Sequence, residues 1–126
     1  GRFNYFNSLS SIPGGYLMAH PKKFNLYIDP GHAWLRVPLS ELRRLSSPAP
    51  GRNLLELISP YSFINNEWVY LEEDQDAALY LERLKEDGFD PFNEWGSVNE
   101  IISDNPSQIR NYKHFDYLNI ISGGAV

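Results

Sequence analysis

The chain contains no cysteine among its 126 residues. This absence excludes a disulfide framework, a thiolate nucleophile and any zinc site that uses cysteine ligands. Proteins of reducing compartments rarely carry disulfides, so the composition suits a cytoplasmic protein. We therefore expect a cytoplasmic protein whose chemistry, if it has any, uses other side chains.

Long hydrophobic runs are missing as well. No stretch of the sequence approaches the roughly 18 apolar residues that a membrane-spanning helix needs. The chain also does not open with a basic segment followed by an apolar one, the pattern of a signal peptide. We therefore expect no membrane partner.

Positive charge is scarce. Eleven Lys and Arg stand against sixteen Asp and Glu, which gives a net charge of −5. The basic residues form pairs, such as Lys22-Lys23 and Arg43-Arg44, and no longer run. Sequence-independent nucleic-acid binding requires clustered basic side chains, so direct nucleic-acid binding is not expected. The acidity is also too dilute for a protein that mimics a row of phosphates.

Aromatic residues, by contrast, are abundant, with seven Phe, eight Tyr and three Trp. The length suits one domain over residues 1–126. Residues 1–15 are rich in Asn, Ser and Gly and predict loops, and 122–126 predict a frayed tail. We expect many of the aromatic rings to be half-buried, at a core or at a contact surface.

The segment from Phe24 to Pro38 predicts a hairpin around which the chain is organised. Its turn, Asp29-Pro30-Gly31-His32, combines the fixed φ of proline with a glycine that accepts positive φ. A two-residue loop pairs Tyr27 with Trp34, and strand alternation then separates two faces. One face is apolar (Phe24, Leu26, Ile28, Ala33, Leu35 and Val37), and the other is mixed (Asn25, Tyr27, Asp29, His32, Trp34 and Arg36).

A second hairpin is predicted over 58–72, with Asn65-Asn66 as its turn because Asn tolerates the left-handed conformation. The main helix is predicted at about 75–87. Asp74 is the expected N-cap, and Gly88 the expected left-handed residue after the last turn. One apolar stripe follows helical spacing: Ala77, Tyr80, Leu81 and Leu84.

Shorter elements are predicted from local signals. Residues 40–45 suggest a helix capped by Ser40, 53–57 a helical turn, and 16–20 and 117–121 short strands. The capping-box spacing from Ser97 to Glu100 predicts a helix through 102, and proline at 106 predicts another over 107–114. Together these elements predict an α+β fold: an antiparallel sheet of short hairpins, with one main helix and several short helices packed on one face.

The sequence offers no clear catalytic or metal site. His20, His32 and His114 match no metal-binding spacing, and no nucleophile or phosphate-loop motif occurs. Helix capping and the helix dipole explain Asp74 and Asp76 without a metal ion, and strand alternation separates Glu72 from Glu73. A carboxylate across a hairpin from an imidazole can orient a general base, which is why Asp29 and His32 form a candidate pair. Turn geometry explains Asp29 equally well, so we assign no catalytic residue, metal or cofactor.

The mixed face of the first hairpin is the predicted contact surface. Tyr, Trp and Arg dominate the binding energy of protein interfaces. We therefore predict partner binding through Tyr27, His32, Trp34 and Arg36. The alternative is that a helix or the N-terminal segment covers this face and makes the rings part of a core.

Two motifs also resemble a known family. YIDPGHAWLRVP, followed by ISPYSFINNEWVYLEEDQDA and the helix ALYLERLK, resembles small proteins encoded by bacteriophages and other mobile elements, whose pattern is YIDPGHGWLxVP and then VYLEEDxDA. The likeness covers about residues 27–84. It departs at Ala33, where Gly is expected, at Gln75, where Cys is common, and in an insertion over 46–53. The family carries no established activity, so the resemblance implies a context and no mechanism.

That context makes a non-enzymatic binding protein the leading hypothesis. The resemblance implies a phage protein that acts on a host protein in the host cytoplasm, as a viral inhibitor of host defence, for example of the anti-CRISPR type. Two alternatives stay open. One is a metal-independent hydrolase or nuclease that uses Asp29 and His32, together with His114. The other is a homo-oligomer that sequesters a nucleotide, and a homodimer is compatible with the binding hypothesis too.

Overall fold

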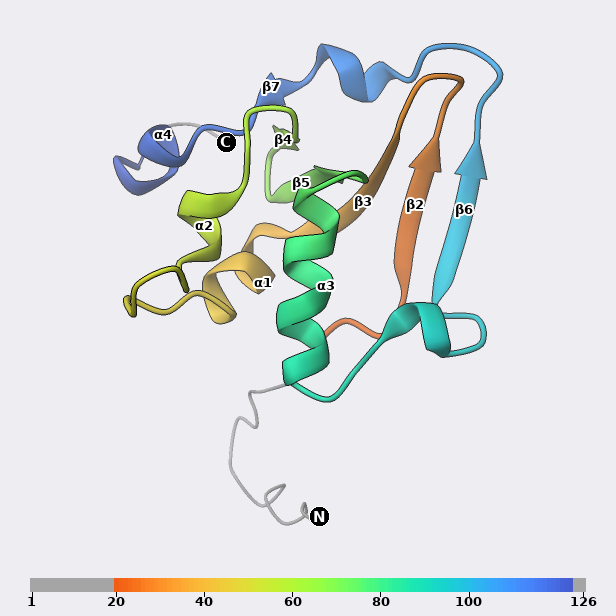
Figure 1. The fold of residues 1–126 in the computed structure, drawn as a ribbon. Coiled ribbons are helices and arrows are strands. Elements are labelled where there is room, and N and C mark those ends of the chain that lie inside the picture. The colour runs from red at the N-terminus through yellow and green to blue at the C-terminus, as the bar shows by residue number, and fades with distance from the viewer. Residues whose placement is uncertain (1–19, 124–126) are drawn as a thin grey trace.

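A computed structural model describes residues 20–123 and confirms the α+β class (Figure 1). An open six-stranded sheet has the order β6-β2-β3-β5-β4-β7. All neighbouring strands are antiparallel except β2 and β6, which are parallel. The strands are β2 (Phe24–Ile28), β3 (Ala33–Pro38), β4 (Phe63–Asn65), β5 (Trp68–Glu72), β6 (Val98–Ile102) and β7 (Lys113–His114).

The central hairpin of β2 and β3 has the predicted register. Tyr27 lies opposite Trp34, and Ile28 opposite Ala33. The Asp29 amide donates to the His32 carbonyl over 2.9 Å, which closes a two-residue loop. Gly31 does not adopt positive φ, so the expected reason for a glycine there is wrong. A Cβ atom at Gly31 would instead lie 2.9 Å from Nη2 of Arg110.

The second hairpin, β4 and β5, forms within the predicted range but has a shifted turn. Phe63 pairs with Tyr70 on one face, and Ile64 with Val69 on the other. Asn65 pairs with Trp68, so the turn is formed by residues 66 and 67. Asn66 has the left-handed φ of 56°. The prediction of a left-handed asparagine in this turn is correct, but only one of the two asparagines adopts that conformation.

The main helix α3 (Asp76–Glu86) ends as predicted and begins differently. Gly88 has φ 97°, and the Phe89 amide donates back to the Leu84 carbonyl over 3.2 Å, as in a Schellman end. The cap is not Asp74. The carboxylate of Glu72 accepts hydrogen bonds from the amides of residues 74, 75 and 76, at 2.9, 2.7 and 3.1 Å.

Three helices cover one face of the sheet: α1 (Leu39–Arg44), α2 (Leu54–Leu57) and α3 (Figure 1). Pro38, and not Ser40, occupies the N-cap of α1. Arg83 of α3 donates to the carbonyls of Arg52 and Gly51, both at 2.9 Å, and so fixes the predicted insertion against the helix. The core beneath is mainly aliphatic (Phe24, Leu35, Val37, Leu39, Leu42, Leu54, Ile64, Val69, Leu71, Tyr80 and Leu84).

The predictions for the last third of the chain were wrong in several places. Residues 98–102 form strand β6 and not a helix, because their backbone pairs with β2 and their β-branched side chains favour a strand. The region predicted as a helix over 107–114 holds the 3₁₀ turn η3 (Gln108–Asn111) followed by β7. Residues 117–121 form helix α4 (Tyr117–Ile121), capped by Asp116. A further 3₁₀ turn, η2, spans Pro91–Asn93.

One connection crosses the sheet from edge to edge. Because β6 and β7 are the two edge strands, residues 103–112, here called the crossing segment, run from one side of the sheet to the other (Figure 1). Ile109 and Tyr112 of this segment pack against Trp34, Phe63 and Tyr70. Strand alternation places these rings on the face opposite the helices. The crossing segment is therefore the cover of the aromatic face.

Some predictions concern parts of the chain outside the described residues. These are the loop-rich segment 1–15, most of the strand expected at 16–20, and positions 124–126 of the tail. Within residues 20–123, no helix is long and apolar enough to cross a membrane.

Candidate functional site

The four residues predicted to bind a partner share one face but not one environment. Trp34 is only 2% exposed, because the crossing segment covers it. Tyr27 is half-buried, with its ring 5.9 Å from that of Tyr70. The alternative that these rings form a core therefore holds for Trp34, and its role as a surface contact is corrected.

Arg36 and His32 lie at opposite ends of the same face. The guanidinium carbon of Arg36 lies 4.0 Å from the centre of the Trp68 ring and 5.9 Å from that of Tyr27. His32 is exposed beside the turn at the other end of the strand. These positions separate the predicted surface into two parts, so the four residues do not act as one continuous patch.

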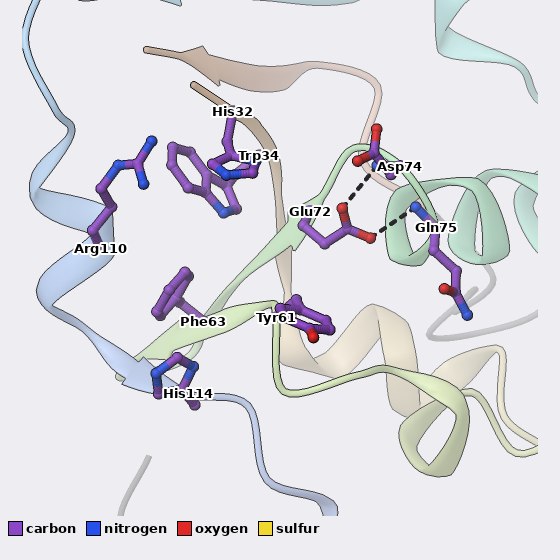
Figure 2. A pocket seen from close by; sticks show the side chains of 9 residues that line it. All are labelled: His32, Trp34, Tyr61, Phe63, Glu72, Asp74, Gln75, Arg110 and His114. Carbon is purple, nitrogen blue, oxygen red and sulfur yellow. Dashed lines mark hydrogen bonds between the residues drawn. The ribbon is translucent and has the colours of Figure 1, made fainter. Parts of the chain in front are cut away.

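The part around His32 is a pocket of about 550 Å³. Trp34 and Phe63 are its most deeply buried lining residues. Figure 2 shows the side chains around it, which come from β3, β4, β5, η3 and β7, from the residues just before β3 and β4, and from the connection between β5 and α3. The lining consists of His32, Trp34, Tyr61, Phe63, Glu72, Asp74, Gln75, Arg110 and His114.

Four rings follow one another along this pocket. The distance between ring centres is 6.0 Å from His32 to Trp34, 6.2 Å from Trp34 to Phe63, and 4.8 Å from Phe63 to His114. Tyr61 stands at the rim with 77% of its surface exposed. The pocket thus combines a buried aromatic base with accessible rings at its edge.

Arg110 belongs to this site, although no sequence signal predicted its role. Its Nε and Nη2 atoms donate to the two oxygens of Asp29, at 2.7 and 2.8 Å. The amides of Gly31, His32 and Ser107 donate to the same carboxylate, at 3.0, 3.0 and 2.8 Å. Arg110, more than any other donor, holds the pKa of Asp29 well below its usual range, and Asp29 in turn raises the pKa of Arg110.

This arrangement changes the role of Asp29. Both carboxylate oxygens of Asp29 accept from N–H groups. The carboxylate bonds to His32 only through the backbone amide of that residue. The carboxylate therefore joins the DPGH turn to the crossing segment. It does not orient the imidazole as a catalytic base requires.

The two pocket histidines lie far apart for joint catalysis. His32 adjoins β3 and His114 lies in β7, which are three strand spacings apart in the sheet, or about 14 Å. Nδ1 of His114 is 2.7 Å from the Pro60 carbonyl, a contact that holds the ring to the loop before β4. His20 lies elsewhere, stacked on Phe89 at 4.4 Å. Neither pocket imidazole has a carboxylate partner within residues 20–123.

The acidic residues near the pocket do not build a metal centre. Over the described part of the chain, no three His, Asp or Glu side chains are grouped so that they could hold a metal ion. Glu72 caps α3, and the buried Asp76 accepts from the hydroxyls of Ser59 and Ser62, at 2.7 and 2.6 Å. Asp74 remains as an exposed carboxylate at the rim.

Comparison of the chain with known protein families, with curated proteins and with solved structures finds no match. The family resemblance of the two motifs therefore stays a prediction. The functional argument rests on the pocket itself.

Proposed function

We propose that this chain is a small non-enzymatic binding protein and that the aromatic pocket is where it contacts a partner protein. The observation that carries the proposal is the open pocket of about 550 Å³ with a buried base of Trp34 and Phe63 and an exposed rim that includes Tyr61. Binding hot spots combine such aromatic anchors with a surrounding polar rim.

The chemistry of the pocket supports binding over catalysis. A general base needs a positioned partner and a reacting atom within hydrogen-bond reach. Asp29 is occupied by N–H donors, and His32 and His114 are anchored three strand spacings apart in the sheet, about 14 Å. A nucleotide-sequestering role is disfavoured as well, because the guanidinium of Arg110 is already paired with Asp29.

The motif resemblance supports a more specific version of this proposal. In that version the protein is phage-encoded, acts in the host cytoplasm, and inhibits a host protein or complex that takes part in defence, as anti-CRISPR proteins do. The net charge of −5 favours a partner with a basic surface. A homodimer is compatible with this proposal, since the pocket lies within one chain.

The test is affinity capture from a bacterial lysate, with the captured protein identified by mass spectrometry. We expect Tyr61→Ala to abolish capture, because the exposed ring of Tyr61 forms the rim of the pocket. Trp95→Ala is the matched control, since Trp95 is fully exposed and does not line this pocket. Both variants should keep the wild-type melting temperature.

Two results would contradict the proposal. One is capture that survives Tyr61→Ala, whether or not Trp95→Ala removes it. The other is turnover of a nucleotide, RNA or ester substrate that disappears in His32→Ala or His114→Ala. The second result would favour the hydrolase hypothesis, which has one observation on its side: both histidines line the same pocket.

A further inference from the structure

We infer that the pocket accepts an arginine side chain of the partner protein, with the guanidinium against the aromatic rings and the carboxylate of Asp74. This inference rests on the proposed function and adds the chemical class of the group that enters the site. Two properties of the pocket lead to it, the arrangement of the rings and the balance of charge. Together they determine the shape and charge of the ligand.

The rings provide surfaces for a planar cation. Cations bind over the faces of Trp, Tyr and Phe, and guanidinium groups stack on such faces more often than ammonium groups do. Figure 2 shows Trp34, Phe63, Tyr61 and His114 around the hollow of the pocket. The molecule already contains this type of contact nearby, because the guanidinium carbon of Arg110 lies 5.3 Å from the centre of the Trp34 ring.

The charge of the pocket is negative. Arg110 (+1) and Asp29 (−1) form an ion pair and cancel. Glu72 (−1) and Asp74 (−1) remain, which gives a formal sum of −2 with both histidines neutral. The Asp74 carboxylate accepts no hydrogen bond from residues 20–123, so it is available to a ligand. This negative charge repels an anion, and the one arginine among the described lining residues is already paired. A cation, by contrast, is attracted.

The helix terminus does not reverse this conclusion. The N-terminus of α3 borders the pocket, and a free helix N-terminus attracts anions. Here Glu72 already accepts from the amides of residues 74, 75 and 76. The site that a phosphate would use is therefore occupied by a side chain of the protein itself.

A planar, delocalised cation fits these conditions better than a compact one. Arginine is more weakly hydrated than lysine, it stacks on rings, and it donates two parallel hydrogen bonds to a carboxylate. The arginine would lose less hydration free energy than lysine on entering a site whose base is buried. We therefore assign the pocket to arginine and treat lysine as a separate arm of the test.

The experiment uses the full chain and three blocked tripeptides, Gly-X-Gly, in which X is arginine, citrulline or lysine. Citrulline has nearly the shape of arginine without its charge. Binding is followed by NMR through the indole N–H signal of Trp34. We expect the arginine peptide to shift this signal, and the citrulline peptide to bind about 10-fold more weakly, the loss typical of a charge-assisted hydrogen bond.

Two variants separate the pocket from the general acidity of the chain. Asp74→Asn should weaken binding of the arginine peptide about 10-fold, because it removes the free carboxylate. Glu73→Gln is the matched control: it removes the same charge one residue away, and Glu73 does not line the pocket. Equal effects of the two variants would overturn the inference, as would equal binding of the citrulline or lysine peptide. Tighter binding of adenosine monophosphate would overturn it too.

Failure of this inference differs from failure of the proposed function. If the tripeptides do not bind while Tyr61→Ala still abolishes capture of the partner, the pocket is a contact site that takes another group. If Tyr61→Ala leaves capture unchanged, the pocket is not the contact site and the proposed function itself fails.

Discussion

The two faces of the sheet use the same strands but are filled and covered in different ways. The face beneath α1, α2 and α3 carries aliphatic side chains at alternate positions, such as Leu35, Val69 and Leu71, all of them buried. The opposite face carries Trp34, Phe63 and Tyr70, with the crossing segment as its cover. Aliphatic groups and a helical layer close the first face, whereas the second keeps a pocket of about 550 Å³.

The difference shows how one small sheet can combine a closed, stabilising face with a face that keeps an opening. Three helices bury the aliphatic face continuously, and this face supplies most of the hydrophobic stabilisation. Aromatic rings bury a large area even when one edge stays exposed, so a single connection suffices to order the other face. The second face can therefore keep an opening without unfolding the domain.

The largest expected effect compares one buried residue from each face. Leu71→Ala should lower the free energy of unfolding by about 3–5 kcal/mol. It leaves a cavity on the helix-covered face, and the packed helices cannot move in to fill it. Ile109→Ala should cost about 2 kcal/mol, the low end for such truncations, because its cavity lies beside an open pocket. Chemical denaturation at neutral pH measures both.

Equal losses for the two variants would show that the crossing segment seals its face as firmly as the helices do. Exposed positions supply the baseline for this comparison. Ser40→Ala in α1 and Gln108→Ala in η3 should each change the free energy of unfolding by less than about 0.5 kcal/mol.

The sequence predicted the elements whose signals are local. The register of the first hairpin followed from its alternation and a two-residue loop, and the end of α3 followed from Gly88. More than half of the buried core on the helix-covered face comes from these two regions and the second hairpin, and α1 and α2 add Leu39, Leu42, Leu54 and Leu55. Most of this core was therefore predictable.

The aromatic face depended on pairings that no local signal reveals. The spacing of Ser97 and Glu100 matches a capping box, yet pairing with β2 makes the segment a strand. Arg110 meets Asp29 across 81 positions of sequence, and nothing near Arg110 indicates that partner. The burial of Trp34 follows from these contacts. For this reason the sequence separated the two faces of the hairpin but did not reveal the pocket on the aromatic one.

The ion pair between Asp29 of the hairpin turn and Arg110 of the crossing segment predicts a smaller, pH-dependent effect on the melting temperature. Asp29→Asn removes the charge that pairs with Arg110, and we expect the melting temperature at neutral pH to fall by roughly 5 °C. Asp104→Asn is the matched control, because Asp104 is exposed on the same segment, and its melting temperature should stay within about 1 °C of wild type.

The pH dependence of this difference has a defined direction. The pKa of Asp29 in the folded protein lies far below the value of about 4 expected for the unfolded chain. Its contribution to stability is therefore complete above about pH 5 and is lost as the pH falls below 4, toward the folded pKa. The difference in melting temperature between wild type and Asp29→Asn should narrow as the pH falls from about 4 toward 2. A constant difference would show that the carboxylate does not act through its charge.

The smallest expected effect concerns the exposed part of the aromatic face. The guanidinium of Arg36 lies 4.0 Å from the Trp68 ring, whereas its distance to the Tyr27 ring is 5.9 Å. A double-mutant cycle with Arg36→Ala and Trp68→Ala should give a coupling of about 0.5–1 kcal/mol, the range for exposed cation–π pairs. The same cycle between Arg36 and Tyr27 should give less, because the cation is farther from that ring. Since Trp68 does not line the pocket, Trp68→Ala should leave binding of the arginine tripeptide unchanged, and a loss of binding there would mean that the two parts of this face act together.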